Sequence, residues 1–209
     1  MNINLVKQER VKYYYNTINC FIIKKPLPVH PIMMLLYMTT EITLKRLVKE
    51  GKLKQFEPDL LPDESHEREI FMTTALFKYI DETVLKKHGL EYQVIVEQHL
   101  TSFARGDKIR SGTHIKEVMP FGNGVWAFRI LEDPQTRIFG GFIEKDRFVA
   151  FCIVRKSNLV GNSYNHNYSY YLNRVKREWK ILLNNKAILL SSNINDLVSN
   201  GVCNDKRKK

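Results

Sequence analysis

The chain has 209 residues, of which 44% are hydrophobic and 11% aromatic, so it can form a packed core. This composition excludes a chain that is disordered throughout. The formal net charge of +11 favours nucleic acid, the ribosome or an anionic membrane surface as a partner.

The cysteines and the apolar runs limit the cellular setting. Cys20, Cys152 and Cys203 lie far apart, without C-x-x-C spacing or a histidine at ligand spacing, so we expect no disulfide framework and no metal or other cofactor. No apolar run approaches the roughly 18 residues of a membrane helix, and charges interrupt the first ten positions where a secretory signal would be apolar. We therefore predict a cytoplasmic protein without a membrane partner.

Residues 1–65 are predicted to be an N-terminal extension. Pro26, Pro28 and Pro31 argue against a helix or a central strand before Met38. Thr39 and Thr40 then provide the caps of a helix, and one hypothesis is that Met38 is the natural start. The extension is divided into a leader at 1–37, a short helix at 39–50 and an acidic linker at 52–65.

Residues 66–183 are predicted to be one α+β domain that begins with a strand at 68–73. Apolar residues at helical spacing predict a helix from Thr74 to Lys87 and a second one at 90–104. Gly89 ends the first helix, and the very short connection predicts an antiparallel helical hairpin.

The pattern then alternates with a period of two residues. Strands are predicted over 114–119, 125–131, 136–143 and 147–155. Short turns between them predict a four-stranded antiparallel meander. A closing helix is expected over 163–183, and a C-terminal extension, with a basic tail at its end, over 184–209.

Three motifs of this module stand in a fixed order. Lys116–Arg129 reads KEVMPFGNGVWAFR, Arg137–Phe139 reads RIF, and Phe151–Ser157 reads FCIVRKS. Together with the order of elements, they resemble the RelE/HigB (ParE) toxin superfamily, in its HigB-like or phage-derived branch, over about residues 66–182. The resemblance implies a RelE-like fold of strand, two-helix hairpin, four-stranded antiparallel meander and closing helix.

The same resemblance implies a function. Such toxins of type II toxin–antitoxin systems enter the ribosomal decoding site and act as mRNA interferases. The messenger's own 2′-hydroxyl attacks the adjacent phosphate, so the cleavage needs no metal. Cationic side chains stabilise the transition state. The partners expected are mRNA on the ribosome and a helix-turn-helix antitoxin protein.

The candidate site residues are the cations and one tyrosine at the ends of the predicted strands and on the closing helix. Arginines converging on one sheet face would bind phosphate bidentately and remain charged at any working pH. The residues predicted to support cleavage are Arg129, Arg137, Arg155 and Lys156. The residues predicted to bind RNA are Lys116, Tyr164, Arg174 and Arg177.

Other interpretations stay open. RelE-type members carry lysines on the strand that here reads Trp126-Ala127-Phe128, which favours a non-catalytic protein of the same fold that acts on nucleic acid, gyrase or another protein. Arg129 and Arg137 could instead pair with Glu132 or Glu144. Trp126 is expected in the core, and the tyrosines at 164–171 are expected to pack the helix.

Two further hypotheses concern individual charged residues. His114 could act as an acid or base near neutral pH, although no carboxylate partner is evident for it. The acidic stretch 57–69 could cover a basic cleft by charge complementarity, or could simply be a solubilising linker.

Overall fold

The computed structural model describes residues 31–159, 164–184 and 186–202, with the side chains of 31–37, 83–88 and 164–166 excepted. Contacts between residues divide the chain between Thr39 and Thr40. The description below concerns the second unit, from Thr40 onward. None of the described helices is both long enough and apolar enough to cross a membrane.

The main sheet has six strands in the order β1-β2-β7-β6-β5-β4. A separate two-stranded sheet pairs β3 with β8. The strand bounds are β1 Leu53–Gln55, β2 Glu69–Thr73, β3 Ile109–Arg110, β4 Ile115–Glu117, β5 Val125–Ile130, β6 Thr136–Glu144, β7 Arg147–Arg155 and β8 Gly201–Val202.

The helices surround this sheet in the chain order α2 to α6. A π-helical turn, η1, joins α3 to α4, and a 3₁₀ turn, η2, follows β7. Their bounds are α2 Pro31–Lys49, α3 Thr74–Lys78, η1 Tyr79–Val84, α4 Leu85–Arg105, η2 Lys156–Leu159, α5 Tyr164–Leu183 and α6 Ile194–Leu197. The α+β class is therefore confirmed.

The antiparallel meander is also confirmed, because β4 to β7 pair successively in antiparallel fashion. The first predicted strand, β2, joins this sheet beside β7, and that pair is parallel. The chain must therefore cross over between them, and α3, η1 and α4 belong to the crossover. On the outer side of β2, β1 pairs antiparallel at 53–55, at the start of the segment predicted to be a linker.

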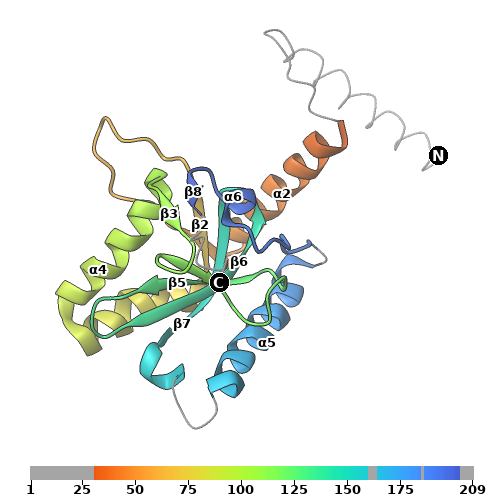
Figure 1. The fold of residues 1–209 in the computed structure, drawn as a ribbon. Coiled ribbons are helices and arrows are strands. Elements are labelled where there is room, and N and C mark those ends of the chain that lie inside the picture. The colour runs from red at the N-terminus through yellow and green to blue at the C-terminus, as the bar shows by residue number, and fades with distance from the viewer. Residues whose placement is uncertain (1–30, 160–163, 185, 203–209) are drawn as a thin grey trace. The chain divides into compact units, whose positions relative to one another are not determined.

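Helices cover both faces of the sheet, and Figure 1 shows α4 and α5 on opposite sides of it. On one face, Val96, Leu100 and Phe103 of α4 pack against buried residues of the strands. On the other face, Val175 and Trp179 of α5 pack together with the end of α2. Alternation along each strand separates the two cores, and Trp126 lies fully buried in the core on the α4 side, as expected.

The predicted start of the first helix is wrong, whereas the predicted break at Gly89 is confirmed. The helix α2 begins at Pro31 and not at residue 39, because proline is tolerated in the first turn, where its missing N–H has no helical partner. Thr39 and Thr40 therefore lie inside the helix and do not cap it. The two helices predicted around Gly89 meet at that residue in a sharp bend with φ +80°. The leader before Pro31 lies outside the described residues.

The C-terminal extension contributes to the core. Ile194 and Leu197 of α6 are buried against the α4 side of the sheet. Leu189 N–H donates to the carbonyl oxygen of Phe142 at 2.8 Å, so the segment before α6 runs along the end of β6. These contacts tie the residues after α5 to the meander.

Replacing Gly140 with alanine should lower the free energy of unfolding by about 2–3 kcal/mol, the cost of forcing extra volume into a packed core. The added Cβ would overlap the backbone carbonyl oxygen of Val149 and the ring of Phe148, and that carbonyl cannot rotate away. Gly122→Ala is the control: no atom lies within 4 Å of its Cβ position, and only its backbone φ of +79° opposes a side chain, at a cost of about 1 kcal/mol. Urea denaturation measures both, and an equal loss in the two variants would contradict this account.

Candidate functional site

Arg137 is not available to bind RNA as predicted. It stands opposite Arg129 in the β5–β6 register, so both side chains start from the same face of the sheet. Its side chain is only 4% exposed, however. One guanidinium nitrogen donates to the carbonyl oxygens of Ile130 at 3.2 Å and Thr136 at 2.7 Å. Arg137 therefore holds the ends of β5 and β6 together.

The predicted convergence of three arginines on one face is also wrong. Arg155 pairs with Thr136, whereas Arg137 pairs with Val154. Because side chains alternate along a strand, Arg155 starts from the face opposite to Arg129 and Arg137. Arg155 is exposed at the end of β7, and Lys156 is exposed at the start of η2.

The predicted RNA-binding residues are dispersed as well. Lys116 is exposed on the edge strand β4, and Arg177 is exposed on α5. Arg174 is partly buried and bonded through Nε to the Glu178 carboxylate at 2.7 Å. The side chain of Tyr164 lies outside the described residues.

The described ion pairs of the acidic stretch 57–69 do not connect it to the residues of the predicted site. Glu64 pairs with Arg105 at 2.6 Å, and Glu69 pairs with Arg147 at 2.5 Å. Neither arginine belongs to the predicted site. Arg147 also binds Glu144, the residue considered as a partner for Arg129 or Arg137.

A small cavity between α4 and β5 contains the side chains best suited to proton transfer. Its volume is about 150 Å³, roughly five times the ~30 Å³ that a water molecule occupies in the liquid. It has room for a phosphoryl group and not for a whole nucleotide. It is lined by His99, Leu100, Ser102, Ile109, His114, Phe128, Arg129, Ile130 and Ile138. We call it the histidine pocket.

His99 is oriented by a carboxylate. Its Nε2 lies 2.8 Å from Oε2 of Glu132, and both side chains are partly accessible to solvent. Burial acts to raise the pKa of Glu132, but hydrogen bonds from backbone N–H groups and from His99 outweigh it, so this pKa lies below the ordinary value. A carboxylate only accepts, so Nε2 of neutral His99 carries the hydrogen and Nδ1 is left to take a proton.

His114 is partly buried beside Arg110. Burial lowers its pKa most and the charge of Arg110 lowers it further, while a hydrogen bond with the backbone of Lys108 acts to raise it; the net pKa lies below the ordinary value. The backbone N–H of Arg110 points at His114 Nδ1 over 3.4 Å. The backbone N–H of Arg129 donates to the carbonyl oxygen of His114 at 2.8 Å, which joins this turn to β5.

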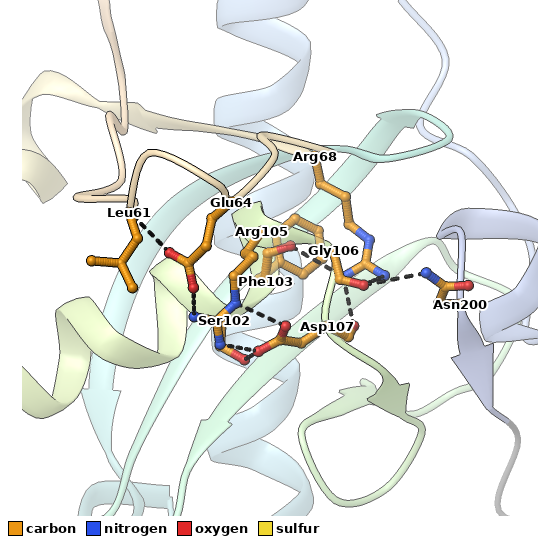
Figure 2. A network of polar contacts seen from close by, with 9 residues as sticks. All are labelled: Leu61, Glu64, Arg68, Ser102, Phe103, Arg105, Gly106, Asp107 and Asn200. Carbon is orange, nitrogen blue, oxygen red and sulfur yellow. Dashed lines mark hydrogen bonds and ion pairs between the residues drawn. The ribbon is translucent and has the colours of Figure 1, made fainter.

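A polar network fixes the helix end that carries His99. Ser102 Oγ, one turn after His99, donates to Asp107 at 2.6 Å, and Arg105 binds the same carboxylate. Figure 2 shows Arg105 between Asp107 and Glu64. Next to this network, Arg68 donates to the backbone carbonyl groups of Phe103 and Asp107, at and just after the end of α4. These bonds fix the C-terminal end of α4, the helix that carries His99.

The pocket thus combines a histidine held by a carboxylate with a second, partly buried histidine beside Arg110. Among the predicted catalytic residues, Arg129 alone lines it. Sequence reasoning considered His114 but missed His99 and Glu132, which are 33 positions apart and meet only through the packing of α4 on the sheet. Within the described residues, no three His, Cys, Asp or Glu side chains gather closely enough to hold a metal ion.

No family model matches the chain, and comparison with curated proteins and with solved structures finds no match. The resemblance to RelE/HigB toxins rests on its three motifs.

Proposed function

We propose that this protein cleaves RNA at the histidine pocket by a metal-independent attack of the 2′-hydroxyl on the adjacent phosphate. The observation that carries the proposal is that His99, held by Glu132, and the partly buried His114 line one cavity. General acid–base groups whose environments differ in this way are suited to opposite tasks in one reaction.

In the proposed step, Nδ1 of His99 takes the proton of the 2′-hydroxyl. The 2′-oxygen then bonds to phosphorus, and the bond from phosphorus to the 5′-oxygen breaks. The leaving 5′-oxygen takes a proton from water. His114 donates a hydrogen bond to a phosphate oxygen, and the exposed Arg110 adds positive charge around it.

The substrate we propose is messenger RNA on the ribosome in the cytoplasm. The net charge of +11 supports an RNA or ribosome partner. The resemblance over residues 66–182 supports a toxin of a toxin–antitoxin pair, with a helix-turn-helix antitoxin and a RelE-like arrangement of the meander. Primer-extension mapping of messages in expressing cells tests this: codon-phased cuts that depend on His99 are expected, and intact messages would contradict it.

A second candidate function is binding of nucleic acid without cleavage. The burial of Arg137 and the separation of Arg155 from Arg129 favour it, because these residues do not form a common phosphate site. The absence of lysines at 126–128 favours it too. In that case the protein would bind RNA oligonucleotides but leave them uncut, and changes at His99 would not alter translation.

Changing His114 to glutamine should retain more cleavage than changing it to alanine. Glutamine keeps a neutral N–H donor near the position of Nε2, whereas alanine removes it, so we expect a loss of about tenfold for His114→Gln and about 10²-fold or more for His114→Ala, the scale of one lost transition-state donor. Single-turnover cleavage of a short RNA measures both. Equal losses would indicate that His114 only supports the fold of the turn.

A further inference from the structure

Strand β7 has an open edge over its second half. Its parallel pairing with β2 ends at Met72 and Ala150, because β2 turns into α3 directly after Thr73. Pairing with β6 continues on the other side as far as Arg155. Among the described residues, no strand lies beside β7 beyond Ala150 on the side that β2 has left.

The backbone polar groups of this edge point alternately to either side. Lys156 N–H donates to the carbonyl oxygen of Gln135 at 2.7 Å, so positions 156 and, two residues earlier, 154 face β6. The N–H and C=O of the intervening residue, Ile153, therefore face away from β6. They face the side where a strand could be added.

A cavity of about 860 Å³ lies along this edge. Tyr79 and Leu76, from the α3–η1 segment, line one wall, and Tyr171 and Arg174 of α5 line another. Residues 151–155 of β7 form the floor between them. The cavity thus joins a strand edge to the aromatic side chains of Tyr79 and Tyr171.

The charges at the end of this cavity are positive. Arg155 and Arg174 line it together with one carboxylate, Glu178, which already binds Arg174. Lys156 follows Arg155 and is exposed. A ligand that reaches this end should therefore carry negative charge.

We propose that the open edge of β7 binds an extended, acidic peptide segment of a partner protein, which adds a strand beside residues 151–155. Main-chain donors and acceptors that alternate along an edge are matched by another extended polypeptide, and a nucleic acid backbone has no such pattern. Apolar side chains of the peptide would enter between Tyr79 and Tyr171, and acidic ones would meet Arg155 and Lys156. This inference uses none of the residues of the histidine pocket.

The probe is a fluorescein-labelled eight-residue peptide of alternating valine and glutamate, titrated with the full-length protein and followed by fluorescence anisotropy. Its matched control has the same sequence with alternate amide nitrogens methylated, which keeps the charge but removes the edge-facing donors. We expect saturable binding that methylation weakens at least tenfold. Equal binding of the two peptides, or no binding of either, would overturn the proposal.

Variants of the protein locate the site. Ile153→Pro removes a donor that faces away from β6, and Arg155→Glu reverses the charge at the end of the cavity; each should weaken binding at least tenfold. Lys145→Glu, an equal charge change at the exposed β6–β7 turn, should change it less than twofold. Arg155→Glu keeps the test decisive should the proline variant not fold. If an eight-nucleotide RNA displaces the peptide as well as unlabelled peptide does, or if the protein alone is a dimer that Ile153→Pro dissociates, the peptide assignment is wrong.

Discussion

Purified protein in which His99 is replaced by alanine should cleave RNA about 10²–10⁴-fold more slowly than the unchanged protein, the typical contribution of one general base. The reason is that Glu132 holds Nε2 of His99, so Nδ1 of this pocket-lining residue is the nitrogen left to accept a proton. His99→Gln should be as inactive as alanine, because an amide cannot act as a base at neutral pH.

The control for this variant is Gln98→Ala. Gln98 is the preceding residue of α4, is exposed, and does not line the histidine pocket. Its cleavage rate should stay within twofold of the unchanged protein, and circular dichroism should show that both variants keep the helix. A His99→Ala protein that cleaves at the normal rate would remove His99 from the proposed chemistry.

Replacing Arg68 with methionine should lower the free energy of unfolding by about 3–5 kcal/mol, the cost of removing one partner of a buried ion pair. Arg68 is 1% exposed and lies 3.3 Å from the Asp146 carboxylate. It also donates to the carbonyl oxygens of Phe103 at 3.1 Å, Asp107 at 2.9 Å and Gly106 at 3.2 Å. A further bond to the carbonyl of Ser199 ties in the segment before β8.

This loss is large because the methionine variant removes the cation that pairs with Asp146 and the donor that the carbonyl groups of four residues share. A small domain is stable by about 5–15 kcal/mol, so the variant should be close to unfolding at ambient temperature. Arg105→Met is the matched control from the same network. Arg105 is more than a third exposed and pairs with Glu64 and Asp107 near the surface, where water screens both pairs, so its loss should cost much less than the loss of Arg68.

Urea denaturation of the two arginine variants separates a buried hub from a surface pair. If Arg68→Met is no more destabilised than Arg105→Met, the end of α4 is held by packing and not by the guanidinium of Arg68. The comparison also bears on function, because His99 lies on the same helix, close to the end that Arg68 holds.

The meander was predictable because its signals are local. The strands β5, β6 and β7 lie within one residue of the predicted bounds, since Gly122-Asn123-Gly124 and the later turns separate short runs of alternating residues. The partner of β2 was not predictable in this way. Its parallel pairing with β7 joins segments almost 80 positions apart, and no residue of either strand specifies the other.

The faces of the sheet were harder to predict than its strands. A single position of register decides which side a residue occupies, and the pairing of Thr136 with Arg155 places that arginine opposite to the predicted side. Similarly, the burial of Arg137 depends on carbonyl groups at the end of β5, which its own sequence neighbours do not reveal. The His99–Glu132 pair joins a helix to a turn between strands, and only the packed structure brings them together.

The central claim is that the 2′-hydroxyl of the substrate is the nucleophile and that the histidine pocket activates it. The most direct measurement uses ribosomes programmed with a short messenger and the purified protein, with the product ends analysed by mass spectrometry. We predict a 2′,3′-cyclic phosphate on the upstream fragment, no cleavage when the nucleotide at the cut is 2′-deoxy, and none with His99→Ala. Cleavage of the 2′-deoxy messenger, or an upstream fragment that ends in a free 3′-hydroxyl, would contradict the account.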